Sequence, residues 1–113
     1  MAPAPVPPAP AAPESGAIDA PPPGWAQVVR GGVPALEKRW RLPDFAQAMA
    51  LAQAVAGLAE RLNHHPDLHV GWGHLAVVWT THDAGGVTAL DVRAARATDE
   101  LADAARAQPR ATP

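Results

Sequence analysis

The sequence predicts a small α+β domain whose elements follow the order hairpin, helix, hairpin, helix. Two observations support this fold class. Apolar residues recur at steps of three and four in two long segments, and each segment follows a pair of short stretches separated by glycine. The chain has 113 residues, of which 48% are hydrophobic and 18% charged. This composition suits one folded domain.

The first 23 residues differ in composition from the rest of the chain. Nine of the 14 prolines lie between Pro3 and Pro23, interleaved with alanine. Proline removes an amide donor and fixes extended backbone, so we expect residues 1–23 to form a disordered or polyproline-like tail. The folded domain is expected over residues 24–108, followed by a disordered C-terminus at residues 109–113.

The first hairpin and the first helix follow the tail. The hairpin strands are expected over residues 25–30 and 35–42, because Gly31 and Gly32 suit a tight turn with positive φ angles. Pro43 and Asp44 are typical of a helix start, and Pro66 disfavours helical backbone in the residue before it. The expected helix has an apolar stripe made of Phe45, Ala48, Leu51, Val55, Leu58 and Leu62.

The second hairpin and the last helix complete the domain. Strands are expected over residues 70–72 and 75–81, around Gly73, and Thr88 with Asp91 resembles a capping box that starts the last helix. The apolar positions of this helix are Leu90, Ala94, Thr98, Leu101 and Ala105. A face so rich in alanine buries little area, so it must lie flat on a sheet or pair with another subunit. We expect a homodimer or homotetramer.

Composition disfavours several classes of function. A net charge of -2 provides no broad positive field for direct binding of nucleic acid. No apolar stretch approaches the roughly 20 residues of a membrane span, and the N-terminus lacks signal-peptide features. The absence of cysteine rules out disulfides and thiolate chemistry and is compatible with a reducing compartment. The expected location is therefore cytoplasmic, away from membranes.

All five histidines lie within 19 residues, at positions 64, 65, 69, 74 and 82. Clustered imidazoles suit general acid–base catalysis or metal binding. His65 and His69 have the spacing of two zinc ligands on one helix, but Pro66 lies between them and no cysteine could complete a tetrahedral site. We therefore expect no metal, and a small metal-binding domain remains as a competing hypothesis.

The arrangement of motifs resembles the pterin-4a-carbinolamine dehydratase family. The stretch AERLNHHPDLHV places Glu60 four residues before His64-His65-Pro66, and TTHDAGGVTALDV supplies Thr81-His82-Asp83 and then Asp91. The 18-residue interval between His64 and His82 matches the family, and Gly24-Trp25 and WRLPDFAQA resemble its upstream segments. There are two departures. Leu42, and Trp72 in the stretch HVGWGHL, each stand where another residue is common in the family.

The resemblance implies a fold and an activity. The family fold is a four-stranded antiparallel sheet with helices packed on one face. The implied activity removes water from 4a-hydroxytetrahydropterin to give quinonoid dihydropterin in tetrahydrobiopterin recycling, with pterin as the substrate and no cofactor. It would serve a pterin-dependent hydroxylase pathway. The alternative is a coactivator-type binding or dimerisation partner without catalysis.

The resemblance also implies roles for individual residues. His64 and His82 would be the acid and base of the dehydration, in an order that the sequence leaves open, and His65 would assist at the 4a-hydroxyl. The expected substrate-binding residues are Glu60, Pro66, Thr80, Thr81, Asp83 and Trp25. Asp83 or Asp91 could orient an imidazole, although helix capping is an equal alternative for Asp91, as core packing is for Trp25. His69 and His74 are expected to be surface or hydrogen-bonded residues outside the site, and Trp40 and Trp79 to serve packing.

Overall fold

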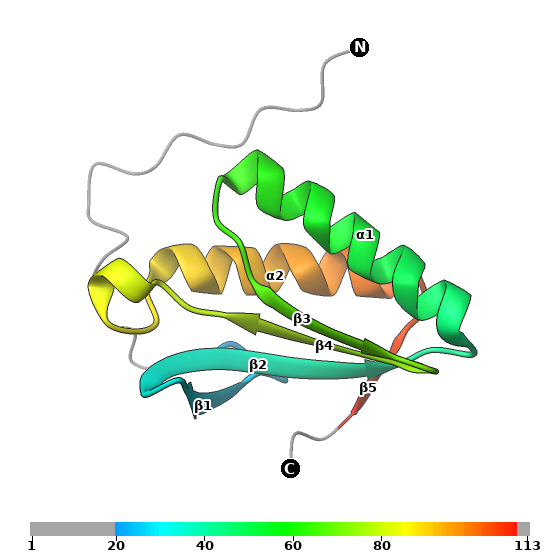
Figure 1. The fold of residues 1–113 in the computed structure, drawn as a ribbon, viewed down its shortest axis with the longest axis horizontal. Coiled ribbons are helices and arrows are strands. Elements are labelled where there is room, and N and C mark those ends of the chain that lie inside the picture. Colours follow the sequence, from blue (N-terminus) through cyan, green and yellow to red (C-terminus); the bar gives the residue numbers. More distant parts are fainter. Residues whose placement is uncertain (1–19, 111–113) are drawn as a thin grey trace.

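The computed structural model describes residues 20–110, in which two helices cover one face of a sheet and leave the other face open (Figure 1). This arrangement confirms the predicted α+β class. The elements in chain order are β1 (Ala26–Arg30), β2 (Val33–Arg41), α1 (Phe45–Leu62), β3 (Asp67–Gly71), β4 (His74–Trp79), the short 3-10 helix η1 (His82–Ala84), α2 (Ala89–Ala104) and β5 (Gln108–Arg110).

Most of the Pro/Ala-rich segment lies outside the described residues, which begin at Ala20. The backbone N–H of Trp25 donates to the carbonyl of Pro22 at 3.0 Å, and Pro22 is buried. Ordered contacts therefore begin slightly before residue 24, where the domain was expected to start. The expectation of a disordered tail for residues 1–19 stays a prediction.

The sheet is antiparallel, and its strands lie in the order β1-β2-β4-β3. Gly31 and Gly32, with φ angles of 59° and 78°, form the turn of the first hairpin as expected. The second hairpin begins earlier than predicted, at Asp67, because the polar and apolar residues from Asp67 to Val70 alternate as a half-buried strand requires. It ends at Trp79, two residues before the predicted end at Thr81.

A fifth strand, β5, adds to the expected four-stranded sheet, and it includes Pro109 and Arg110, which were expected to belong to a disordered C-terminus. β1 pairs with β2 only as far as Glu37, so the edge of β2 beyond that residue is open. β5 fills this gap, with Pro109 opposite Trp40 and Arg110 opposite Arg39. A strand of three residues that contains a proline has no periodic pattern, so the sequence could not indicate it. Residues 111–113 lie outside the described part.

The helix α1 begins and ends with side-chain and backbone caps. Asp44 accepts a hydrogen bond from the backbone N–H of Gln47 at 2.8 Å, the usual stabilisation of a first turn. At the other end Asn63 adopts left-handed backbone with φ of 50°, and the N–H of His64 reaches back to the carbonyl of Ala59. The buried stripe agrees with the prediction except at its ends. Leu62 is partly buried, and Phe45 is 48% exposed because it lies in the first turn, at the edge of the core.

The helix α2 uses small residues to approach the rest of the core. Ala94, Ala95, Thr98 and Ala102 are all fully buried, so the middle of the alanine-rich face is covered within the chain, whereas Ala105 of the expected stripe is exposed. Asp99 adds a polar anchor: one oxygen lies 2.7 Å from Nζ of Lys38 and the other accepts the indole N–H of Trp25 at 3.1 Å. Close packing and these ionic contacts together hold α2 against the sheet.

The capping residue Asn63 gives a test of how the end of α1 is built. Replacing Asn63 with alanine should lower the free energy of unfolding by roughly 1–2 kcal/mol, because a Cβ disfavours left-handed backbone and alanine lacks the polar side chain that offsets this cost. Asn63→Gly should keep or slightly raise stability. Urea denaturation of both variants provides the measurement, and equal stability of the alanine and glycine variants would contradict this account of the helix end.

Candidate active site

The left-handed residue at the end of α1 turns the chain sharply and sets the positions of the two neighbouring histidines. His64 follows Asn63 directly and is held by its backbone bond to Ala59. His65 comes next, and Pro66 then leads the chain into β3. The same backbone feature that ends the helix therefore determines the positions of both imidazoles.

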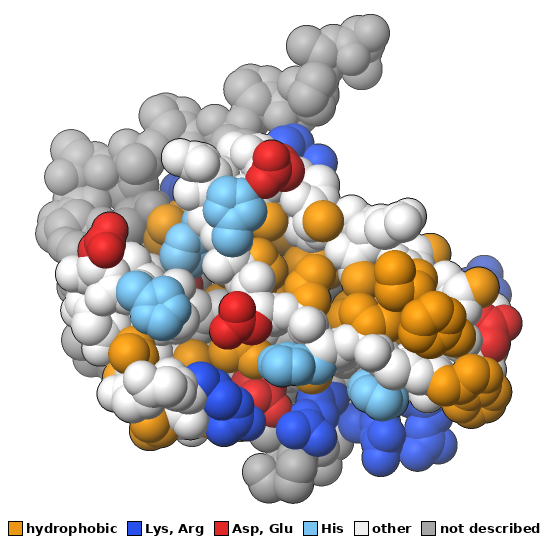
Figure 2. All heavy atoms as spheres, in the orientation of Figure 1, with side chains coloured by type: hydrophobic (Ala, Val, Ile, Leu, Met, Phe, Trp, Pro, Cys, Tyr) orange, Lys and Arg blue, Asp and Glu red, His pale blue; other side chains and the backbone are white. Residues whose placement is uncertain are grey.

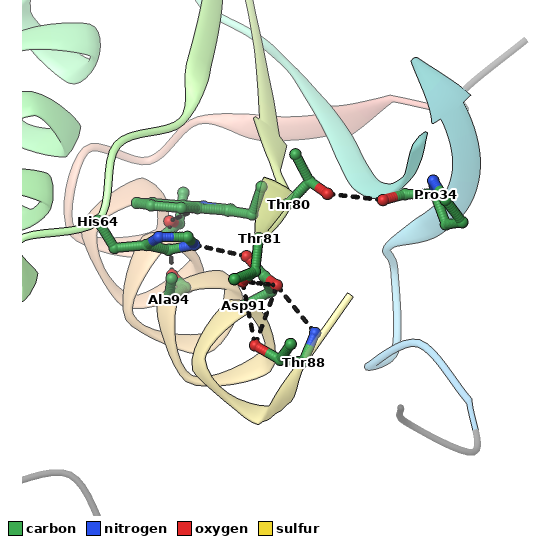
Figure 3. Close-up of polar contacts among 9 residues, drawn as sticks. Pro34, His64, Thr80, Thr81, Thr88, Asp91 and Ala94 are labelled. Carbon is green, nitrogen blue, oxygen red and sulfur yellow. Dashed lines mark hydrogen bonds and ion pairs between the residues drawn. The ribbon is translucent and has the colours of Figure 1, made fainter. Parts of the chain in front are cut away.

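His64 is fixed by the buried carboxylate of Asp91, the third residue of α2 (Figure 3). Nε2 of His64 lies 2.6 Å from Oδ1 of Asp91, and the side chains are 13% and 0% exposed, respectively. The other oxygen, Oδ2, accepts from the hydroxyl of Thr81 at 2.7 Å and from the backbone N–H of Thr88 at 2.9 Å. One carboxylate thus connects the end of α1, the segment after β4 and the start of α2.

This arrangement indicates which ring nitrogen of His64 carries the proton. Both oxygens of Asp91 face donors, which is the environment of an ionised carboxylate acting only as an acceptor. Nε2 of His64 therefore carries hydrogen toward Asp91, and Nδ1 is left with a lone pair when the imidazole is neutral. A carboxylate in this position also stabilises the imidazolium that forms if Nδ1 takes up a proton.

A tryptophan completes the surroundings of His64. The imidazole stacks on Trp79 with ring centroids 5.5 Å apart and an interplanar angle of 20°. The indole N–H of Trp79 donates to the hydroxyl of Thr98 at 3.1 Å, and Thr98 in turn donates to the carbonyl of Ala94. The stack and the Asp91 bond together restrict the orientation of the His64 ring.

His65 lies in a different environment from its neighbour. Its Nε2 hydrogen-bonds to the carboxylate of Glu60, and the two side chains are 59% and 75% exposed. Solvent screens such a pair, so it contributes little to stability. His65 and Glu60, both expected site residues, are therefore brought together on the surface.

His82 and Asp83 belong to η1, directly after Thr81, and both are exposed. Among the described residues, neither side chain forms a hydrogen bond, so Asp83 does not orient an imidazole in this structure. Because Thr81 is bonded to Asp91 and Asp91 to His64, the start of η1 is tied to the end of α1. The convergence of these two segments, which the sequence only implied, is therefore built through Asp91.

The two threonines expected to hold a substrate have other partners. The hydroxyl of Thr80 donates to the carbonyl of Pro34 at 2.7 Å, and Figure 3 shows it pointing away from His64. The hydroxyl of Thr81 is used on Asp91, and its backbone N–H and carbonyl pair with Gly86. These contacts make both threonine side chains supports of the loop, and substrate binding by the strand backbone near Thr80 and Thr81 stays a prediction. Pro66 lies next to the histidines and redirects the chain.

Trp25 takes its alternative role, which corrects its assignment as a substrate-binding residue. The side chain is 4% exposed and packs edge-to-face on Trp40, with centroids 5.6 Å apart. With its N–H on Asp99, the ring has no free face for a ligand. Packing inside the domain explains its position fully.

Sequence reasoning missed the contribution of Trp79 to the site. An alternating strand predicts Trp79 as a core residue, and it is fully buried. The pattern carries no signal that its ring also contacts His64, 15 positions earlier in the chain. For Asp91 there were two signals, the capping-box pattern and its place in the family motif, and the structure shows that capping and imidazole orientation coexist.

Figure 2 shows the histidines of the visible face in two places, one near the end of α1 and η1 and the other along the edge where the basic side chains, coloured blue, gather. Over residues 20–110, no group of three or more His, Asp or Glu side chains is arranged to hold a metal ion. No helix in the same range is long and apolar enough to cross a membrane.

Comparison with known proteins gives a consistent result. The family model described as pterin 4 alpha carbinolamine dehydratase matches residues 11–101. A relative from Gloeobacter violaceus, provisionally named pterin-4-alpha-carbinolamine dehydratase 2, is 42% identical over 73 residues, covering 65% of this chain and 79% of its own. A relative from Vibrio cholerae with a similar provisional name is 40% identical over 78 residues, covering 69% and 72%.

Two solved structures are also similar. One is described as a transcriptional coactivator/pterin dehydratase from Brucella melitensis; it has a TM-score of 0.64 and 32% identity, and the match covers 71% of this chain and 83% of that one. The other is a pterin dehydratase-like protein identified as a RuBisCO assembly factor in the alpha-carboxysome. It has a TM-score of 0.55 and 26% identity, with 68% and 89% covered.

The proposed proton position on His64 can be tested directly. In ¹⁵N spectra of the imidazoles, neutral His64 should carry its proton on Nε2. Asp91→Asn should reduce this preference, because an amide can donate as well as accept. Asp83→Asn is the matched control, since it makes the same chemical change at an exposed residue nearby, and it should leave His64 unchanged. A neutral His64 protonated mainly on Nδ1 in the unaltered chain would contradict the assignment.

Proposed function

Because the chain belongs to the pterin 4 alpha carbinolamine dehydratase family, we propose that it removes water from a 4a-hydroxytetrahydropterin to give a quinonoid dihydropterin. The observation that carries this proposal is the His64–Asp91 pair beside the segment that contains His82. This is the kind of arrangement that proton transfer requires.

The reaction needs two proton transfers and no change of oxidation state. The bond between C4a and the hydroxyl oxygen breaks, and a proton delivered to that oxygen makes it leave as water. The proton on N5 is removed, and its electron pair forms the new double bond between N5 and C4a. One acid and one base therefore suffice, and two imidazoles at different positions around the ring can supply them.

We assign the base to His64. Its Nδ1 has the free lone pair, and Asp91 stabilises the imidazolium that results from proton uptake. The stack on Trp79 keeps the ring from rotating, which favours a fixed direction of proton transfer. Burial of Asp91 excludes solvent from the carboxylate and strengthens its effect on the imidazole.

The acid in this proposal is His82, with His65 assisting at the departing hydroxyl. His82 is exposed, so it can regain a proton from solvent after each turnover. Glu60 holds His65 from the surface side through their hydrogen bond. Asp83 has a lesser part in this scheme, as a charge beside His82 in η1.

Several finer points belong to the same proposal. The substrate class is a tetrahydropterin carbinolamine, and no cofactor is required because the reaction exchanges only protons and water. A pterin-dependent hydroxylase would be the source of the carbinolamine in a tetrahydrobiopterin recycling pathway. We further propose a cytoplasmic location and a homodimer or homotetramer, as the sequence predicts.

The dehydration assay tests the proposal. Purified protein should accelerate the formation of quinonoid dihydropterin from 4a-hydroxytetrahydropterin. His64→Ala and His82→Ala should each lower kcat by on the order of a hundredfold or more, since each removes one proton-transfer group. The comparison is the initial rate at saturating substrate, with correct folding checked by circular dichroism.

His69→Ala is the matched control for these variants. It also removes one imidazole, but His69 lies on β3, on the sheet face away from the helices. Its rate should equal that of the unaltered chain. Full activity in both the His64 and the His82 variants would refute catalysis by this site.

A binding function without catalysis is the second candidate. The RuBisCO assembly factor among the similar structures supports it, and so do large apolar side chains on the surface, Trp72 at 74% and Val29 at 64% exposed. Tryptophan is enriched at protein–protein interfaces, so an exposed Trp72 suits contact with another protein. Under this hypothesis the chain binds a protein partner, and the dehydration rate measured with the purified protein equals the uncatalysed rate.

A further inference from the structure

The two histidines that the candidate active site does not use meet on the opposite face of the sheet. Ala76 of β4 pairs with His69 on one side and with Arg39 on the other, and Arg39 pairs with Arg110 of β5. Residues paired across neighbouring antiparallel strands point to the same face. One row of side chains, Arg110, Arg39, Ala76 and His69, therefore crosses four strands on the face that no helix covers.

The row contains a hollow because its central residue is small. Ala76 has only a methyl group between the long side chains of Arg39 and His69, and it is 6% exposed because its neighbours stand around it. A pocket of about 430 Å³ lies over it, and Arg30, Glu37 and His74 complete the lining. This volume is within the range of small-molecule sites.

A buried glutamate fixes two of the arginines. Glu37 is 2% exposed, although it lies on the open face. Its Oε1 accepts from Nη2 of Arg30 at 2.6 Å, and its Oε2 accepts from Nε of Arg39 at 3.0 Å. Because Arg39 uses only Nε, both of its terminal nitrogens remain free to donate toward the pocket. Glu37 therefore orders the guanidinium groups before any ligand arrives.

A glycine fixes the second imidazole. A Cβ built on Gly71 would lie 2.1 Å from Cε1 of His74, so the ring of His74 occupies the space above Gly71. Any other residue at position 71 would displace this ring. The sequence HVGWGHL, which departs from the family pattern, thus supplies both the imidazole and the space that receives it.

The charges of the pocket are unbalanced. Three arginines and one glutamate line it, which leaves two positive charges even when both histidines are neutral. Within the described range Arg110 has no ion-pair partner, while Arg30 and Arg39 share a single carboxylate. A further acid on this face, Asp67, lies on β3 outside the pocket lining.

We propose that this pocket binds a small anion through a phosphate or carboxylate group. Guanidinium groups present paired donors that match the oxygens of both anions, and imidazoles add donors from the opposite side. A lining of charged side chains around a methyl floor suits a small polar ligand better than the apolar surface of another protein chain. The site is separate from the dehydratase proposal, because it lies on the other face of the sheet.

Titration of the full chain with inorganic phosphate and, separately, with citrate tests the site. Saturable shifts in ¹H–¹⁵N spectra should appear at the backbone of His69 and Ala76. Arg110→Gln should raise the Kd for the bound anion about tenfold by removing a charged donor. Ala76→Leu should abolish binding by filling the floor of the pocket. A response to phosphate alone identifies the phosphate class, and a response to citrate alone identifies the carboxylate class.

Arg96→Gln is the matched charge control, because Arg96 is an exposed arginine of α2 on the helical side of the molecule. It should leave binding unchanged, and Arg110→Gln should leave the dehydration rate unchanged. The proposal is overturned if neither probe gives saturable shifts, or if Arg96→Gln weakens binding as much as Arg110→Gln. Sedimentation provides a further check. A change of oligomeric state in Arg110→Gln without anion binding would identify the face as a subunit interface, and that too would overturn it.

Discussion

The buried carboxylate of Asp91 is the interaction on which the candidate active site depends. It accepts hydrogen bonds from His64, Thr81 and the backbone of Thr88, and so joins three segments that are distant in sequence. Removing a carboxylate from water is costly unless donors replace the lost hydration, and here donors face both oxygens. Correct closure of these three segments and correct placement of the imidazole are therefore the same structural event.

This dual use couples stability to chemistry. The bond from Thr88 is an ordinary helix cap, whereas the bond from His64 defines which ring nitrogen is free. A change at Asp91 would disturb both, so loss of activity in such a variant would not by itself identify a catalytic residue. The neighbouring imidazoles differ in this respect, because His65 and His82 are exposed and can be changed at little cost to folding.

The five histidines lie within 19 residues of the sequence, but the sheet separates them into two groups. His64, His65 and His82 lie at the end of α1 and in η1, while His69 and His74 point from β3 and β4 to the uncovered face. Side chains alternate between the two faces of a strand, so a difference of a few positions is enough to place an imidazole on either side. The second group lies among arginines ordered by Glu37, where its chemistry suits an anion.

The sequence by itself determined the α+β class, the start of the first helix at Asp44 and its end between Asn63 and Pro66, the first turn at Gly31-Gly32 and the set of histidines that resembles a family site. These features depend on local backbone preferences and short spacings, which a sequence displays directly. Only the tertiary structure decided that Trp25 is a core residue, that Trp79 stacks on His64 and that β5 closes the edge of β2. It also showed that Thr80 and Thr81 support the loop. Each of these depends on contacts between residues far apart in the chain, and periodicity contains no information about which distant partners will meet.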